Sequence, residues 1–421
     1  MNAPLTPAAV RRRFCVLSFF VNLPTGLYTV PLVLLLSARG LDPAEIGLVF
    51  AAYGVTTVVL ELPTGGLADV IGRRAVLLTS AVIGTASLVM MGLGTSLGAL
   101  VLASALRGVS RTLRTGPLES WYVDSLRAAD PEADLKPGLA RGNAWTSAAL
   151  AMGALAGGLI APALPSLRWG PVIPLSVPLL LAAAASAALF LLILLAMPEP
   201  PFAHAGLRAV LRSVPATIGS GARVSARDAV VLRVLAVALG TGLALNAMEL
   251  LTPGRIAGAV EHLELAAGAY GVVVTLGFAA TAGGSALAPA AARRLGSASA
   301  GAVAGTLIVA AALAGLAATA TLAGAAGVAA TAAGYWCLYT GLGLVEPLRM
   351  DLLHNRVSSA ERATVLSIDS LVQQLGNVGG AVLFGWLAVA YGIRPAWFVA
   401  AALVLAAALL YPRARAGATL R

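Results

Sequence analysis

Charged side chains that interrupt long apolar stretches are the residues of this chain most suited to chemistry. Arg107, Arg111 and Arg114 are spaced i, i+4 and i+7, so a helix would place all three on one face. A guanidinium group can bind a carboxylate or phosphate through two parallel hydrogen bonds, which makes this face a candidate anion site. The alternative is structural, with Arg111 neutralising Glu119 or Glu249.

Carboxyl groups in the apolar stretches are candidates for proton transfer. A carboxyl group in an apolar cavity can titrate near neutral pH, because burial disfavours its charged form. Glu249, in the segment LNAMELLTP, is the acid we favour for this role, and Glu61 and Asp369 could instead form a contact between helices. The proton-coupling candidates are Glu249, Glu119, Glu61, Asp369 and Glu346.

Neutral polar side chains in the same stretches could bind a substrate through hydrogen bonds. Each is costly to bury in lipid, so we expect it to face a cavity or a partner. Beside the three arginines, the substrate-cavity candidates are Asn22, Tyr28, Asn246, Gln373 and Gln374.

The elements that must position these groups are transmembrane helices. The 421 residues are 59% hydrophobic and 11% charged, and the mean hydropathy of +0.89 excludes an ordinary soluble domain. A membrane-spanning helix needs about 20 mostly apolar residues, and the chain holds twelve such stretches. We therefore expect an all-α membrane protein. The predicted helices are 14–37, 44–67, 75–97, 98–126, 139–164, 171–197, 229–253, 266–288, 298–320, 324–348, 363–390 and 394–412.

The net charge of +10 follows from topology and needs no nucleic acid. With a cytoplasmic N-terminus, most Lys and Arg residues fall on the cytoplasmic side, as the positive-inside rule requires. Only Arg39, Arg168, Arg255 and Arg394 fall on the outer side. We expect a multi-pass protein of the cell inner membrane, embedded in the lipid bilayer with both termini cytoplasmic.

The polar segment 198–228 divides the apolar sequence into two halves of equal length. Residues 73–74 and 293–294 are matching Arg-Arg pairs after the second helix of each half. Glu119 and Asp124 in the fourth helix match Glu346 and Asp351 in the tenth, 227 positions later. Such a repeat is typical of transporters. The predicted organisation is a six-helix bundle over 1–197, a cytoplasmic linker over 198–228 and a second six-helix bundle over 229–421.

The segment GGLADVIGRR follows the second helix and carries the pattern G-x-x-x-D-x-x-G-R-R. This pattern resembles the signature of the major facilitator superfamily. The segments ELPTGGLADVIGRR, SRTLRTGPLESWYVD and RATVLSIDSL look like bacterial members often assigned to drug efflux. The resemblance covers essentially the whole chain and implies two pseudo-symmetric six-helix bundles, the major facilitator fold. The signature residues are Gly65, Asp69, Gly72, Arg73 and Arg74.

The resemblance also implies a cytoplasmic latch. In the family this loop pairs with the helices around it, which here gives Asp69 with Arg362 and Arg73 with Asp124. The second half is incomplete: Arg293 can still meet Asp351, but Pro289 stands where the first half has Asp69. We therefore expect an asymmetric latch.

Enzyme chemistry finds little support in the sequence. The single lysine, Lys136, lies in a loop, so the chain has no phosphate-binding lysine motif for ATP. His204, His262 and His354 are scattered and form no metal-ligand cluster, so we expect neither an enzyme nor a cofactor or metal ion.

The resemblance and the buried acids together predict a secondary active transporter that works by alternating access. We expect proton-coupled efflux, as an antiporter, of small amphipathic compounds or drugs. One alternative is an importer or exporter of a small metabolite such as an organic anion. Another is a transport-inactive receptor on the same fold. The expected partners are a small-molecule substrate, protons and lipid, with the chain as a monomer.

Overall fold

The structure, a computed structural model, describes residues 5–65, 67–198, 219, 228–260, 262–357 and 362–411. This part of the chain is helical, apart from turns and one isolated bridge between Trp169 and Val172. Of the predicted linker 198–228, only Pro198, Gly219 and Asp228 lie among the described residues.

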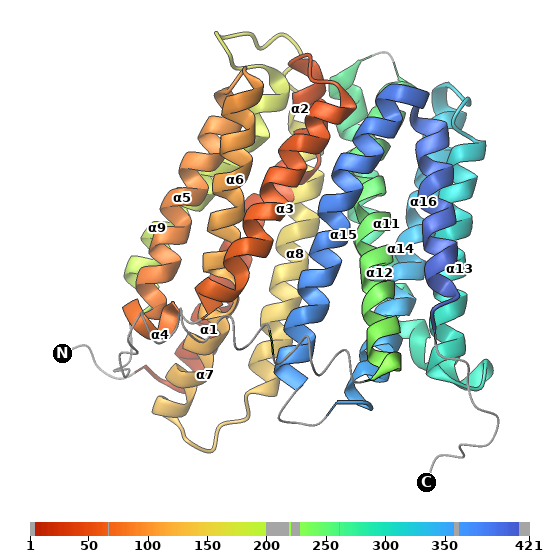
Figure 1. The fold of residues 1–421 in the computed structure, drawn as a ribbon. Helices are drawn as coiled ribbons and strands as arrows, with labels where there is room; N and C mark the ends of the chain where they lie inside the picture. Colours follow the sequence, from red (N-terminus) through yellow and green to blue (C-terminus); the bar gives the residue numbers. More distant parts are fainter. Residues whose placement is uncertain are drawn as a thin grey trace. The chain divides into compact units, whose positions relative to one another are not determined.

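The first half of the chain forms a helix or a broken helix at each of the six predicted places, and the one-turn helix α4 in addition (Figure 1). Two of them are broken. Pro31 accompanies a 41° bend in the first, and Gly116, with φ of +93°, and Pro117 interrupt the fourth. The helices are α1 (Pro7–Thr29), α2 (Pro31–Ala38), α3 (Pro43–Gly65), α4 (Ala68–Ile71), α5 (Arg73–Leu93), α6 (Leu97–Arg114), α7 (Pro117–Ala129), α8 (Lys136–Ile160) and α9 (Val177–Ala196), with a short 3₁₀ turn, η1, at Pro174–Ser176.

Among the described residues, the second half repeats the pattern with six helices, four of which are 29 to 32 residues long (Figure 1). Eight helices among the described residues are long and apolar enough to cross a membrane, or nine if the bent pair α1 and α2 is one span. The tenth predicted helix was too short at 348, because the helix continues for more than one further turn to His354. These helices are α11 (Ala229–Ala257), α12 (Leu263–Arg294), α13 (Ala298–Ala318), α14 (Gly324–His354), α15 (Arg362–Tyr391) and α16 (Ile393–Ala408).

The chain divides into two compact units that follow the predicted halves except in two segments. The start of α3 groups with the second half, and the start of α12 groups with the first. Unit 1 comprises Met1–Gly40, Ala52–Val214 and Leu263–Thr275, and unit 2 comprises Leu41–Ala51, Pro215–His262 and Leu276–Arg421.

Glycines bring backbones into contact at corresponding places in the two units. In unit 1, a methyl group on Gly26 of α1 would lie 2.9 Å from the Cα of Gly153 of α8. In unit 2, a methyl group on Gly242 of α11 would lie 3.0 Å from the Cα of Gly376 of α15. Small residues at such crossings allow helices to pack closely in a membrane, where the hydrophobic effect does not drive association. The first and fifth helices of each half therefore form a matched, tightly packed pair.

Glycines also explain why the start of α3 and the start of α12 group with the other half of the sequence. Within unit 2, Gly47 of α3 lies against the Ala381 carbonyl of α15. Within unit 1, a methyl group on Gly158 of α8 would lie 2.7 Å from the Cα of Gly271 of α12. Any larger side chain would separate these helices, so the exchange of segments depends on glycine.

In each half, one arginine donates hydrogen bonds to carbonyl groups at the end of the third helix. Arg39, which follows α2, donates hydrogen bonds to the carbonyls of Met91 and Gly92 at the end of α5. Arg255 of α11 donates at 2.8 Å and 2.6 Å to the carbonyls of Thr319 and Leu322 after α13. Carbonyls at a helix end lack helical partners and carry partial negative charge, so a cation there stabilises the helix. Burial lowers the pKa of Arg39. The sequence analysis had assigned these residues to the outer side without a role.

Replacing Arg255, the more deeply buried of these two arginines, should destabilise the fold. Because Arg255 is 5% exposed and bonds two carbonyls, Arg255→Met should lower the free energy of unfolding by about 2–3 kcal/mol. The melting temperature of the purified protein in detergent measures the loss. Arg394→Met, at an exposed arginine in the first turn of α16, is the control and should change stability by less than about 0.5 kcal/mol. Equal melting temperatures for the two variants would contradict this stabilising role of Arg255.

Candidate functional site

The arginine face predicted from the sequence lines a pocket in unit 1. The pocket has about 340 Å³ of empty space, including its open mouth. Arg107 lies ten residues into α6, which is about 15 Å along the helix axis from its first residue. The lining comes from α1, α3, α5, α6 and α9 and comprises Pro24, Thr25, Tyr28, Tyr53, Gly84, Leu88, Arg107, Ser110, Arg111, Arg114 and Ser186.

Arg107 lies against the rings of two tyrosines. Its guanidinium carbon is 4.8 Å from the ring centroid of Tyr28 and 4.6 Å from that of Tyr53. Both contacts are favourable cation–π interactions. The Nε and Nη1 atoms of Arg107 are nevertheless buried without a hydrogen-bond partner among the described residues. Two hydrogen-bond donors of Arg107 are therefore unpaired within the described part of the chain.

The other two arginines are each held by one hydrogen bond. Arg111 donates from Nη1 to the hydroxyl of Tyr53 at 3.2 Å. Arg114 donates from Nη1 to the carbonyl of Val21 at 2.8 Å. Glu61 attracts Arg111 electrostatically. The sequence analysis missed Tyr53, because no local pattern in α3 distinguishes a tyrosine that will contact two arginines from one that packs.

The neutral polar candidates have different surroundings. Asn22 in unit 1 donates to the carbonyl of Ser18 and to the hydroxyl of Thr146, so its amide hydrogens are engaged. Asn246 in unit 2 is buried, and its Oδ1 has no hydrogen-bond partner within the described part of the chain. Gln374 accepts a hydrogen bond from Asn377, and Gln373 is partly buried on the same helix, α15.

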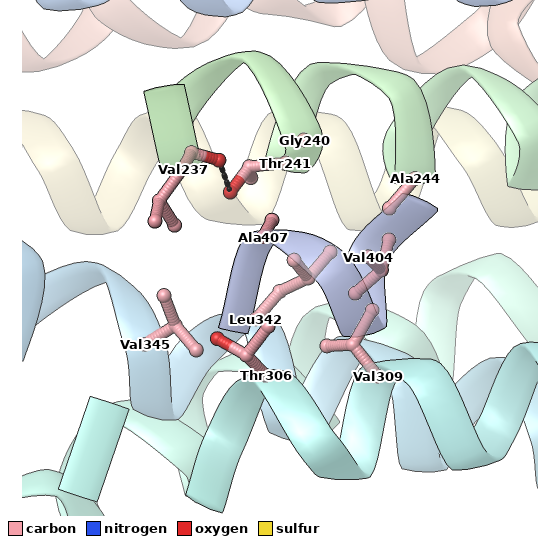
Figure 2. A pocket seen from close by; sticks show the side chains of 10 residues that line it. All are labelled: Val237, Gly240, Thr241, Ala244, Thr306, Val309, Leu342, Val345, Val404 and Ala407. Atoms are coloured by element: carbon pink, nitrogen blue, oxygen red, sulfur yellow. Dashed lines mark hydrogen bonds between the residues drawn. The ribbon is translucent and has the colours of Figure 1, made fainter. Parts of the chain in front are cut away.

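A second pocket lies within unit 2 and is almost entirely apolar (Figure 2). It has about 250 Å³ of empty space between α11, α13, α14 and α16. Figure 2 shows the Thr241 hydroxyl bonded to the Val237 carbonyl one turn earlier, and Thr306 bonds Ala302 in the same way. Because these donors are used within their own helices, this pocket offers no free polar group for a charged substrate.

The predicted acids do not gather in one place. Glu346 and Asp369 of unit 2 both bond Arg349, which is completely buried. Glu249 is exposed on α11 and interacts electrostatically with Tyr339, and Glu119 is exposed in the first turn of α7. The predicted helix 324–348 left Arg349 just outside the membrane-spanning segment, whereas α14 includes it.

The latch residues of the first half are partly brought together. Arg73, at the start of α5, forms an ion pair with Asp124 of α7, as the resemblance implied. Arg74 donates to the carbonyl of Leu194 at the end of α9, and Gly72 turns the chain with a φ of +93°. Gly65 ends α3. Asp69 lies in α4 and Arg362 begins α15, but their side chains are outside the described part, so their pairing stays a prediction.

The second half does not form the matching ion pair. Arg293 has no ion pair among the described residues, and Asp351 accepts a hydrogen bond from Asn355 at 3.1 Å. The expected contact between Arg293 and Asp351 is therefore not present. The asymmetry of the two halves is larger at this position than the sequence analysis expected.

Comparison with known proteins gives the family. The profile of the Major Facilitator Superfamily matches residues 14–376, and the chain therefore belongs to this superfamily of transporters. It is a multi-pass membrane protein and a secondary transporter, as predicted, and not an enzyme. No curated protein sequence matches the chain significantly.

Solved structures with the same fold are distant in sequence. The D323A mutant of the nucleoside transporter NupG matches with a TM-score of 0.77 and 16% identity over 96% of this chain and 98% of that chain. A bacterial homologue of the human lysosomal transporter Spinster, inward-facing and unoccupied, matches with a TM-score of 0.75 and 15% identity over 97% of each chain. A POT family transporter in complex with a thioalcohol-conjugated peptide matches with a TM-score of 0.69 and 12% identity over 95% of this chain and 94% of that chain. These similarities support the fold, and the drug-efflux resemblance is not shown by them.

The ion pair of the latch should be measurable by a double-mutant cycle. The side chains of Arg73 and Asp124 are 19% and 42% exposed, so solvent screening limits their coupling energy to about 0.5–1 kcal/mol. Arg73→Gln and Asp124→Asn should each lower the melting temperature, and the double variant should lose less than the sum. Arg293→Gln with Asp351→Asn is the matched control and should be additive. If both cycles are additive, Arg73 and Asp124 have no coupling energy, and their ion pair does not stabilise the latch.

Proposed function

We propose that this transporter carries a small amphipathic organic anion, which binds at the arginine pocket of unit 1. The observation that carries the proposal is the Arg107 guanidinium, which lies at the pocket with two buried nitrogens that have no partner in the described chain. An unmet donor of a buried cation is costly, and a carboxylate or phosphate would satisfy it with charge-assisted hydrogen bonds.

The charge balance of the pocket supports an anionic substrate. Arg107, Arg111 and Arg114 bring three positive charges to one helix face, where like charges one turn apart repel. Among the described residues, Glu61 is the acid that interacts with this face, through Arg111. One acid cannot neutralise three arginines, so an entering anion would relieve the repulsion.

The remaining lining supports an amphipathic substrate. Tyr28 and Tyr53 present ring faces, and Pro24 and Leu88 add apolar surface at the same pocket. Ligand sites commonly combine such apolar walls with a few polar groups that fix orientation. This combination fits an organic anion with an aromatic or aliphatic part better than it fits an inorganic ion.

The competing proposal is proton-coupled efflux of drugs, for which the motif resemblance is the support. A neutral or cationic drug would gain nothing from Arg107, so the two proposals differ in the charge of the ligand. Location in the cell inner membrane, cytoplasmic termini, a monomeric state and alternating access belong to both proposals.

A binding screen on purified protein tests the charge preference. Pairs of compounds that differ only in charge, such as an aromatic carboxylate and its amide, would be compared by ligand-induced shifts of melting temperature. The carboxylate should bind and the amide should not. Arg107→Met should weaken carboxylate binding by roughly 10- to 100-fold, because a charge-assisted hydrogen bond contributes about 1.5–3 kcal/mol.

Two variants make the screen specific. Arg12→Met removes an exposed arginine of the same unit and should leave binding unchanged. Arg107→Lys keeps the charge but loses the planar fork, and should retain part of the affinity. Equal binding of carboxylates and amides, or an Arg107→Met variant that binds carboxylates as well as the wild type, would overturn the proposal in favour of drug efflux.

A further inference from the structure

Serine hydroxyls form a polar wall of the arginine pocket, separate from the arginine face. Gly84 of α5, Ser110 of α6 and Ser186 of α9 all line this pocket. A methyl group on Gly84 would lie 2.8 Å from the Oγ of Ser110 and 3.2 Å from the Oγ of Ser186. The two serines are 7% and 6% exposed. Both hydroxyl oxygens are therefore buried next to the bare backbone of a glycine that borders the pocket.

These hydroxyls have already donated their hydrogens. Ser110 donates to the carbonyl of Ser80 at 2.8 Å, and Ser80 donates in return to the carbonyl of Ser110 at 2.8 Å. The Oγ atoms of these two serines are 3.2 Å apart, and the shorter bonds to the carbonyls take both hydrogens. Ser186 donates to the carbonyl of Ala81 at 3.1 Å. Because a serine hydroxyl has one hydrogen and two lone pairs, Ser110 and Ser186 can only accept a further hydrogen bond.

Arg107 has the opposite requirement at the same pocket. Its Nε and Nη1 atoms are donors without a partner in the described chain. Arg107 and Ser110 are three residues apart on α6, so their Cβ atoms are about 5–6 Å apart on one face of the helix. A small ligand in this pocket therefore meets donors on one side and acceptors on the other, and an anionic group alone satisfies only the donors.

Electrostatics determine which donor group such a ligand can carry. Arg107, Arg111 and Arg114 line the pocket, and Glu61 is the acid among the described residues that interacts with this face. An ammonium group on the ligand would be repelled by this excess of positive charge. A hydroxyl group is neutral and supplies one hydrogen to the serine oxygens. The pocket therefore favours a hydroxyl over an amino group.

A serine of the same helix pair makes a similar bond away from the pocket. Ser87 of α5 is 0% exposed and donates to the carbonyl of Ala103 in α6 at 2.8 Å. It is not among the residues that line the pocket. Ser87 therefore represents a purely structural serine, with the same type of bond and no contact with a ligand.

We propose that the hydroxyl oxygens of Ser110 and Ser186 form a second subsite of the arginine pocket, which accepts a hydrogen bond from a hydroxyl group of the substrate. The substrate class is then a hydroxylated organic anion, such as an aromatic hydroxycarboxylate. Its anionic group binds Arg107, and its hydroxyl group donates to the two serines. The inference rests on the proposed function for the anionic group, whereas the hydroxyl subsite can be measured with uncharged compounds.

Two sets of small aromatic probes separate recognition of the hydroxyl group from recognition of charge. The uncharged pair is phenol and fluorobenzene, since a phenol titrates only near about pH 10. The charged set comprises the three hydroxybenzoates and the three fluorobenzoates. Fluorine is close to a hydroxyl group in size but has no hydrogen to donate. Ligand-observed NMR titrations of the purified full-length protein in detergent, with empty micelles as the blank, give the dissociation constants.

The ratio of dissociation constants within a pair is the quantity to compare between variants, because differences in partition into apolar surfaces then cancel. Ser186→Ala should reduce the preference for the hydroxyl compound by about 3- to 10-fold. The carbonyl of Ala81 keeps the Thr85 hydroxyl as a donor at 2.8 Å in this variant, so the local structure loses little. Ser87→Ala is the matched control and should retain the wild-type ratio.

A second variant covers the subsite without removing a serine. Gly84→Ala places a methyl group against both hydroxyl oxygens and should reduce the preference in the same way. If Ser186→Ala does not fold, this variant decides. A wild-type protein that binds hydroxyl and fluoro compounds equally, or binds neither, would overturn the proposal. So would a ratio that is unchanged in Ser186→Ala and Gly84→Ala, or one that falls equally in Ser87→Ala.

The two probe sets also distinguish this proposal from the proposed function. If benzoates bind no better than the uncharged pair, the anion site is wrong, while a phenol preference that depends on Ser186 still supports the hydroxyl subsite. If hydroxybenzoates and fluorobenzoates bind equally well and both depend on Arg107, the anion site is supported and the hydroxyl subsite is wrong.

Discussion

A charge inside the apolar interior of a membrane protein must be paired, and this constraint organises the rest of the structure. Water cannot solvate such a group, so its hydrogen bonds and its counter-charge have to come from the chain or from a ligand. Arg39 and Arg255 satisfy the requirement with carbonyls at helix ends. Arg349 satisfies it with two acids. Arg107 satisfies it incompletely, through the faces of two tyrosines, and this shortfall makes its pocket the best candidate for binding a ligand.

The two units place their charges in opposite ways on a shared framework. Unit 1 gathers three arginines on α6 around a pocket, whereas unit 2 gathers two acids around one arginine between α14 and α15. The pocket of unit 1 therefore has an excess of positive charge, and the cluster around Arg349 has an excess of negative charge.

Close backbone contacts supply the rigidity that such sites need. The crossings of α1 with α8 and of α11 with α15 depend on glycines that allow no larger side chain. Side chains at the pocket and at the ion cluster project from helices of these same units, so their geometry depends on packing that tolerates little change. Pro347 is an exception, because it removes one backbone hydrogen bond of α14.

The sequence by itself determined the membrane class, the helical segments, the repeat and the superfamily, because these depend on local apolarity and on short motifs. It also predicted that Arg107, Arg111 and Arg114 share a face, since helical periodicity is a local property. Tertiary structure alone decided what that face meets: Tyr53 comes from α3, more than fifty residues away in sequence. It also decided that Arg349 is buried against Asp369 and that, among the described residues, Asp351 accepts a hydrogen bond from Asn355 and forms no ion pair with Arg293. Partners of a charge are chosen by three-dimensional packing between distant helices, and no local pattern contains that information.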